Sequence, residues 1–429
     1  MHLLIRDATL LDGSTGSIGI EGNRIARIGV DASAESDTPP TRVIDGTDLL
    51  AMPGLVNAHT HAAMTLFRGY GDDMPLMPWL QERIWPAEAK LTDDDVYWGT
   101  RLACAEMIRT GTTLFNDMYW KVPNAVRAIA DSGLRATVSG GLISGDFLGD
   151  LKGEITELIA KYEGGEFPDR VRLAIAPHAV YTVTPDDLEW CAQLASDHDL
   201  PIQIHLSETL HEVEECVATH GVKPTFHLKR HGILERPTTL AHGVWLERDE
   251  LELLADHPAT VVHNPVSNLK LACGQGREER GWFDYPTAKA EGVNVALATD
   301  GTASNTNLDM FEEMKFASLM AKHASGDPTC MPAAETLDIA TRAGADGMGW
   351  TDAGRLEVGA LADIVLVSMR EVTLTPVHDP VSHVVYAANG GTVHTTICDG
   401  RVLMEDGRIE GLEEVRARAI EAARRVTTG

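Results

Sequence analysis

The stretch MPGLVNAHTH, residues 52–61, is an apolar run that stops at two histidines with one residue between them. Side chains alternate between the two faces of a β-strand, so His59 and His61 are expected to leave one strand end on the same side. Two ligands of one metal ion need this placement. A chain with 17 histidines also produces such a pair by chance, so the rest of the sequence has to decide between the two interpretations.

The composition restricts the class of protein. Of the 429 residues 44% are hydrophobic and 23% charged, and no apolar run approaches the roughly 18–20 residues of a membrane-spanning helix. Residues 1–11 show no secretion signal and the six cysteines form no CxxC pair, so we expect a cytoplasmic protein with reduced thiols. A net charge of −28 argues against binding to nucleic-acid phosphates, and we expect neither a nucleic acid nor a membrane as partner.

Between residues 52 and 350, short apolar runs alternate with segments of helical period, such as VPNAVRAIADSG (122–133). This alternation is typical of βα units with a parallel sheet. The expected strands are LVNAH (55–59), TTLFND (112–117), RATVSGG (135–141), VRLAIAPH (171–178), PIQIHLSE (201–208), TTLAHG (238–243), ATVVHNP (259–265) and VNVALATDG (293–301). Eight such units over roughly 300 residues predict an α/β fold of the (β/α)8 TIM-barrel type.

Short strands with glycine turns occupy both ends of the chain, in residues 3–50 and again in 362–369 and 392–409. Neither end is long enough for a well-covered sheet, so we expect both to meet in one small β-domain; two separate terminal hairpins are the alternative. The segment GLEEVRARAIEAARRV (411–426) predicts a helix on the surface or at an oligomer contact. The predicted division is 1–51 with 356–411 for the β-domain, 52–355 for the barrel and 412–429 for the C-terminal helix.

Polar residues end the later predicted strands. They are His178, His205 with Glu208, His242, His263 and Asp300. Barrel enzymes build their sites from the carboxyl ends of the strands, because all strands deliver side chains to the same mouth. Histidines buried for packing alone do not explain this repeated placement, which favours a metal site for His59 and His61.

Three imidazoles and one carboxylate are available for this site, from His59, His61, His205 and Asp300. These are ligand types that zinc prefers, and a zinc ion makes hydroxide available from its bound water near neutral pH. Hydrolysis also needs a proton shuttle, and Glu208, three residues beyond His205, is placed to be one. An exposed loop glutamate is the alternative for Glu208.

Five motifs together resemble the amidohydrolase superfamily, and within it the branch of 5′-methylthioadenosine/S-adenosylhomocysteine deaminases and related chlorohydrolases. They are PGLVNAHTHAAMTLFRG (53–69), HLSET (205–209), LAHG (240–243), HNPVSN (263–268) and ATDG (298–301). The resemblance covers nearly the whole chain and implies a barrel with a β-sandwich formed from both termini. It also implies a site for a single metal ion, and His178 rather than a lysine at the fourth strand end agrees with this.

The resemblance implies that one divalent metal per subunit, zinc or iron, is bound by His59, His61, His205 and Asp300. His242 would orient the attacking hydroxide and stabilise charge at the attacked carbon, C6 of a purine. Glu208 would protonate the ring nitrogen, and Asp300 would pass a proton to the departing amine. The products would be an inosine-type nucleoside and ammonia.

Three further residues match substrate contacts of the family. Trp79 would pack against the nucleoside, Glu88 would hold the ribose diol, and His178 would reach a purine nitrogen. A carboxylate suits two vicinal hydroxyls because it accepts two hydrogen bonds. The alternatives are a core or lid aromatic for Trp79, a solvent-facing glutamate for Glu88 and strand-end packing for His178.

One departure from the family concerns the 5′ end of the substrate. Members that act on S-adenosylhomocysteine tend to carry arginine after the third strand, whereas GLISGDFLGDLKGE (141–154) has only Lys152 as a cation. We therefore expect a small or neutral 5′ group, as in 5′-methylthioadenosine, adenosine or 5′-deoxyadenosine. A guanine-type deaminase, a triazine chlorohydrolase and a non-catalytic scaffold are the alternatives, and the family's habit predicts a homo-oligomer.

Overall fold

The computed structural model describes residues 2–29, 40–145, 150–275 and 282–428. Parallel strands occupy every strand position expected in the middle of the chain, and the fourth is divided into two short pieces. These strands are β6 (Leu55–Thr60), β7 (Thr112–Tyr119), β8 (Arg135–Leu142), β9 (Val171–Leu173), β10 (Ala176–Pro177), β11 (Ile202–Leu206), β12 (Thr238–His242), β13 (Ala259–His263) and β14 (Asn294–Leu297). The predicted α/β class with parallel strands is therefore confirmed.

The parallel strands follow one another around a ring. Strands β6 to β10 form one sheet and β11 to β14 a second. Parallel bridges join Ile175 to Ile202 and Ala179 to His205 on one side. On the other side the amide of Asp300, beyond β14, donates a hydrogen bond to the carbonyl of His59 in β6, at 3.1 Å. The carboxyl ends of all these strands consequently open toward the same region.

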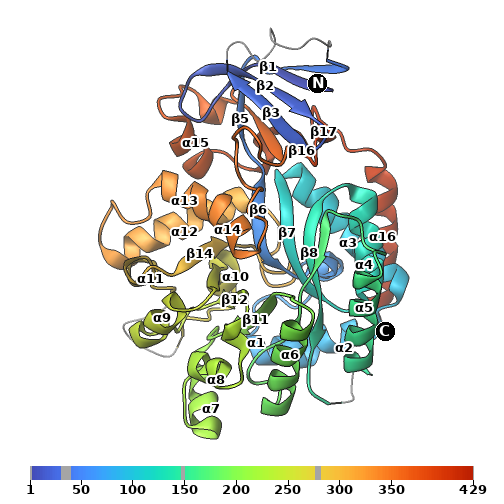
Figure 1. Ribbon diagram of the computed structural model, residues 1–429, viewed down its shortest axis with the longest axis vertical. Helices are drawn as coiled ribbons and strands as arrows, with labels where there is room; N and C mark the ends of the chain where they lie inside the picture. The colour runs from blue at the N-terminus through green and yellow to red at the C-terminus, as the bar shows by residue number, and fades with distance from the viewer. Residues whose placement is uncertain (1, 30–39, 146–149, 276–281, 429) are drawn as a thin grey trace.

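Helices surround the parallel strands (Figure 1). They are η1 (Ala62–Phe67), α1 (Leu76–Trp79), η2 (Leu80–Ile84), α2 (Trp85–Glu88), α3 (Asp93–Arg109), α4 (Val122–Ser132), α5 (Leu151–Glu163), α6 (Pro185–Asp197), α7 (Leu210–His220), α8 (Pro224–Arg230), η3 (Ile233–Glu235), α9 (Arg248–Ala255), α10 (Pro265–Lys270), α11 (Tyr285–Glu291), α12 (Met310–Ser325), α13 (Ala333–Ile339) and α14 (Arg342–Gly347). Local chemistry explains their ends: Thr92 and Asp95 form a capping box at α3, and α4 stops at Gly133, whose φ of 86° favours glycine.

The two ends of the chain meet in one mixed sheet, drawn at the top of Figure 1. Its strands are β1 (Leu3–Thr9), β2 (Thr15–Glu21), β3 (Arg24–Gly29), β4 (Arg42–Asp45), β5 (Leu49–Pro53), β15 (Ile364–Ser368), β16 (Val393–Cys398) and β17 (Arg401–Glu405). Strand β5 pairs with β15 in antiparallel register, so the alternative of two separate terminal hairpins is wrong. That this sheet folds as a sandwich stays a prediction.

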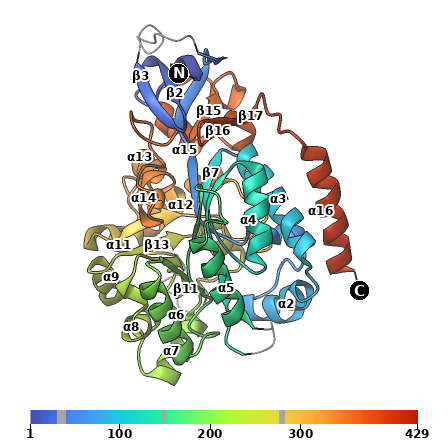
Figure 2. The ribbon, with the colours of Figure 1, turned by 45° about the vertical axis from the view of Figure 1, so that its right-hand side comes forward.

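The C-terminal part contains helices that the sequence did not predict. The short turns η4 (Val372–Leu374) and η5 (Gly390–Thr392) flank α15 (Pro380–Tyr386), which packs against α12 and α13. The expected terminal helix is α16 (Leu412–Thr427), and it lies along α3 of its own chain (Figure 2). The domain division at 51, 355 and 411 stays a prediction, and the chain leaves β5 for β6 across Gly54. Within the described ranges, no helix combines the length and apolar character that crossing a membrane requires.

Candidate metal centre and active site

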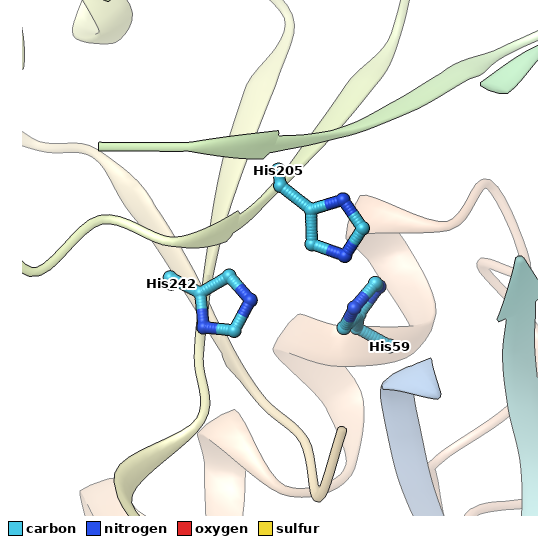
Figure 3. Close-up of side chains that lie close together, drawn as sticks. All are labelled: His59, His205 and His242. Carbon is cyan, nitrogen blue, oxygen red and sulfur yellow. The ribbon is translucent and has the colours of Figure 1, made fainter. Parts of the chain in front are cut away.

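The four predicted metal ligands start from distant parts of the chain and lie together at the carboxyl ends of the strands. The Nε2 atoms of His61 and His205 are 3.2 Å apart. Asp300 Oδ1 lies 3.4 Å from Nε2 of His61 and 3.7 Å from Nε2 of His59. His242 joins the group from the next strand, and Figure 3 shows the rings of His59, His205 and His242 turned toward one another.

The hydrogen bonds of these histidines fit a metal ion. Nδ1 of His61 bonds the carbonyl of Met118 and Nδ1 of His205 the carbonyl of His178, each at 2.7 Å, which leaves Nε2 of both rings as the ligand atom. Nε2 of His59 is buried and has no hydrogen-bond partner among the described residues. Two nitrogens bound to one tetrahedral zinc ion lie about 3.3 Å apart, close to the observed separation. The donor set therefore suits zinc.

Electrostatics keeps the ligands in their binding forms. Burial, and then the neighbouring imidazoles, lower the pKa of His59 and of His205, so both rings are neutral. Burial by itself raises the pKa of Asp300, but His61, His242 and His59 hold it below its usual range. Asp300 Oδ2 accepts hydrogen bonds from the hydroxyls of Ser267 at 2.7 Å and Ser304 at 2.8 Å. Its Oδ1 remains directed at the histidines.

Three strand ends at the site have left-handed backbone. Ser207, His242 and Asp300 have φ values of 49°, 80° and 64°, a region that residues other than glycine rarely adopt. Asn268 holds the side chain of His242 in place, because Nδ1 of His242 lies 2.8 Å from Oδ1 of Asn268. This leaves Nε2 of His242 facing the site, 3.8 Å from Oε2 of Glu208.

Glu208 is buried beside the ligands, so it is not the exposed loop glutamate of the alternative interpretation. The backbone amides of Ser207 and Glu208 both donate to the carboxylate of Glu212, at 2.8 Å, which fixes the turn after β11. The thiol of Cys273 donates to Glu208 Oε1 at 3.4 Å. Burial raises the pKa of Glu208, which favours the protonated acid.

A cavity lies next to the candidate metal ligands, and Trp79, Glu88 and His178 also line it. Glu88 is buried, and its Oε1 accepts a hydrogen bond from the hydroxyl of Tyr119 at 2.8 Å. Its Oε2 has no partner among the described residues, and burial raises the pKa of Glu88 to about 8. His178 is half-buried, desolvation lowers its pKa to about 3, and its Nδ1 lies 2.9 Å from Oγ1 of Thr182. Glu88 is therefore not a solvent-facing glutamate.

Several residues at the site were not predicted. Further side chains that line the cavity include Trp85, Tyr119, Trp120 and Tyr181. Ser267 and Asn268, which hold Asp300 and His242, belong to the motif HNPVSN, and that motif is the only signal that could have found them.

Two residues of the sequence analysis lie away from the cavity. His263, at the end of β13, packs against Phe283 with 5.3 Å between ring centroids and does not line the cavity. Lys152 forms an ion pair with Asp187 and lies over the Trp190 ring, 5.1 Å from its centroid. Residues 146–149 of the same loop are outside the described residues. Lys152 is thus already paired.

Comparison with known proteins gives consistent relatives. Residues 50–403 match the amidohydrolase family. A 5′-deoxyadenosine deaminase of Methanoregula boonei is 48% identical over 90% of this chain and 86% of its own length. A 5-methylthioadenosine/S-adenosylhomocysteine deaminase of Pelotomaculum thermopropionicum is 42% identical over 99% of this chain and 98% of its own. The solved structure of an adenosine deaminase from Xanthomonas campestris with bound zinc is 33% identical, with a TM-score of 0.93 over 100% of this chain and 99% of that one.

Proposed function

The chain belongs to the amidohydrolase family, and we propose that it is a metal-dependent deaminase of adenosine-type nucleosides. It hydrolyses the C6 amino group of 5′-deoxyadenosine, 5′-methylthioadenosine or adenosine to give an inosine-type nucleoside and ammonia. The observation that carries the proposal is the placement of the ligand cluster, Glu208 and Glu88 around a single cavity. Relatives that deaminate such nucleosides share 42 to 48% of their residues with this chain.

His59, His61, His205 and Asp300 would hold a zinc ion, which when bound would lower the pKa of a water molecule toward neutrality. The protein's own groups move the protons. Glu208, whose pKa burial raises, donates a proton to the purine ring nitrogen as the C6–O bond forms and regains one from the added hydroxyl as the C6–N bond breaks. Asp300, a charged carboxylate, takes the proton of the attacking water and passes it to the amine as the C6–N bond breaks. His242 faces the same point and stabilises the charge that develops there.

The nucleoside is bound across the rest of the cavity. Trp79 packs against it and His178 reaches a purine nitrogen. Glu88 accepts hydrogen bonds from the ribose hydroxyls, and its Oε2, buried without a protein partner among the described residues, supports this role. A bare guanine or a triazine has no hydroxyl pair for this oxygen, which favours a ribonucleoside over the alternative substrates. A non-catalytic scaffold has no physical reason to keep this arrangement.

Five further features of the protein belong to the same proposal. They are zinc as the metal, closure of the parallel strands into a (β/α)8 barrel, a terminal β-sandwich, a homo-oligomer and a cytoplasmic location. The ring of strands supports the barrel, and the bound zinc of the Xanthomonas campestris structure supports the metal.

An ammonia-release assay with metal-loaded protein tests the proposal. The substrates are adenosine, 5′-deoxyadenosine, 5′-methylthioadenosine, S-adenosylhomocysteine, guanine and a chlorotriazine. We expect turnover of the first three. Turnover of guanine or the chlorotriazine alone would overturn the proposal.

Replacing Glu208 tests the mechanism. We expect Glu208→Gln to lower kcat by roughly 10²- to 10⁴-fold, the range for acid–base groups, while the metal content per subunit stays at the wild-type value. The matched control is Glu214→Gln, an exposed glutamate of the nearby helix α7. Full activity of Glu208→Gln would exclude Glu208 as the proton donor.

A further inference from the structure

A second cavity lies directly beside the nucleoside cavity, and the two share one wall. Trp120, just beyond β7, and Gly141, in β8, line both cavities. The indole Nε1 of Trp120 donates a hydrogen bond to the carbonyl of Gly141 at 3.2 Å. This bond holds the indole across the boundary and ties the ends of two neighbouring strands together.

The shared wall stands at the ribose end of the nucleoside cavity. Trp120 packs on Tyr119, with 5.1 Å between ring centroids, and Tyr119 bonds the carboxyl of Glu88. Since Glu88 is the group that takes the ribose hydroxyls under the proposed function, the indole lies next to the sugar rather than the base. A long substituent on C5′ would meet the indole as it leaves the ribose.

The second cavity has the chemistry of an amino-acid side pocket. Val122, Ile155 and Leu158 provide apolar surface. The charged groups at its edge are two ion pairs, Lys121 with Asp93 at 3.1 Å and Lys161 with Glu157 at 2.6 Å, and the carboxyl group of Glu154. Such partly exposed pairs are weak and exchange partners readily. A ligand that carries both a carboxylate and an ammonium at the end of an aliphatic chain therefore finds a partner for each charge.

We infer that Trp120 is a specificity-determining residue: its indole closes the nucleoside cavity against the second cavity and limits the 5′ substituent to small groups. This inference rests on the proposed function and deepens it. It gives a steric reason for a preference that the sequence attributed only to the lack of an arginine. In the wild-type protein the homocysteine tail of S-adenosylhomocysteine is excluded from a pocket able to hold it.

The test compares kcat/KM for S-adenosylhomocysteine with kcat/KM for 5′-deoxyadenosine in metal-loaded Trp120→Ala. We expect the ratio of the two values to rise by about tenfold or more over wild type, because a steric exclusion is relieved. The ratio is independent of the folded fraction, so partial instability of the variant does not obscure it. The matched control is Trp98→Ala, a tryptophan of α3 outside both cavities, for which the ratio stays at the wild-type value.

A second variant, Trp120→Phe, covers the case in which Trp120→Ala does not fold. Phenylalanine keeps most of the apolar volume but loses the Nε1 bond to Gly141, so we expect a smaller rise in the same ratio, absent in Trp98→Phe. An unchanged ratio in Trp120→Ala, or in Trp120→Phe where only that variant folds, would overturn the inference. If wild type deaminates none of the adenosine nucleosides, the proposed function itself fails, and this outcome is distinct from a ratio that does not move.

Discussion

Two buried clusters of ionisable side chains lie at opposite ends of the parallel strands, and they differ in whether their hydrogen bonds are complete. At the amino end of β8, Arg135 donates from Nε to Asp363 and from Nη2 to Asp399, each at 2.9 Å. The amide of Asp399 also donates to Asp363, at 2.7 Å. At the carboxyl ends, Nε2 of His59 has no hydrogen-bond partner among the described residues.

The difference separates a structural cluster from a functional one. Asp363 directly precedes β15 and Asp399 directly follows β16, so the Arg135 cluster ties the terminal sheet to the ring of parallel strands. In this cluster the guanidinium group and the carboxylates bond one another. The histidine cluster combines a buried nitrogen that lacks a hydrogen bond with left-handed backbone at neighbouring strand ends. Both features are energetically unfavourable, and a bound group would offset them.

Removing the metal should have the largest effect and should affect only the histidine cluster. Dialysis of the protein against a chelator is expected to lower turnover by at least about 10⁴-fold, since the metal supplies the nucleophile. Addition of zinc should restore turnover. Ammonia release measures the activity, and urea unfolding should show that the chelated protein still unfolds cooperatively. Undiminished turnover at zero metal content would contradict the assignment of the ligands.

Breaking the Arg135 cluster should lower the stability of the protein and leave its activity nearly unchanged. Arg135→Met leaves Asp363 buried without its cation, and we expect the free energy of unfolding to fall by about 3–5 kcal/mol. The kcat of the folded protein should change by less than about twofold, because the two clusters act independently. Urea unfolding and ammonia release measure the two quantities.

The control for Arg135 is an exposed pair. Arg342→Met removes the ion pair with Asp338 on the surface, for which we expect a loss of less than about 1 kcal/mol. Equal losses in the two arginine variants would remove the distinction between a buried and an exposed pair. A loss of kcat in Arg135→Met would instead show that the Arg135 cluster and the histidine cluster do not act independently.

Glu88 offers a test with a smaller expected effect. Like Nε2 of His59, its Oε2 is buried and has no hydrogen-bond partner among the described residues. Glu88→Gln keeps the shape of the side chain and replaces one carboxyl oxygen by an amide nitrogen, which cannot accept a hydrogen bond. We expect KM for adenosine to rise by roughly 10- to 100-fold, because buried hydrogen-bonding groups are then left unpaired. KM for 2′,3′-dideoxyadenosine, which lacks both hydroxyls, should not change; an equal rise for both substrates would exclude the ribose role.

The same variant should alter the pH dependence of stability. Burial raises the pKa of Glu88 from 4.5 to about 8, so the folded protein prefers the protonated carboxyl. Its contribution to stability is present below pH 4.5 and is lost as the pH rises through about 8. The unfolding free energy of Glu88→Gln should therefore decrease less than that of wild type over this range, in urea titrations at a series of pH values. Parallel pH profiles would show that Glu88 does not titrate in the folded state.

The parallel strands and the clustering of the candidate metal ligands could be predicted because their signals are local. A buried strand is a short apolar run, and a strand-end ligand is the polar residue at which the run stops, as at His59, His205 and Asp300. The helix α15 was missed because PVSHVVY, residues 380–386, is a β-branched run whose helix depends on packing against α12 and α13.

The supporting contacts could not be predicted, because they join residues without any regular spacing. Tyr119 bonds Glu88 from 31 positions away, and Arg135 meets Asp363 across 228 positions. Lys152, the one cation expected near the 5′ end, is paired with Asp187, while Lys121 and Lys161 line the second cavity, which shares Trp120 with the cavity at the histidine cluster.

The sequence by itself determined the order of the parallel strands, the meeting of histidines and carboxylates at their carboxyl ends, and the presence of His178 rather than a metal-bridging lysine at the fourth strand end. These depend on hydrophobic periodicity and on the residue at which each run ends, which are read along the chain. Only the tertiary structure decided which polar groups are satisfied and which are left for a ligand. It also placed Trp120 between two cavities. Whether a polar group finds a hydrogen-bond partner, and whether a side chain blocks a cavity, depend on distances between side chains from different elements. The closing of the ring of strands sets those distances.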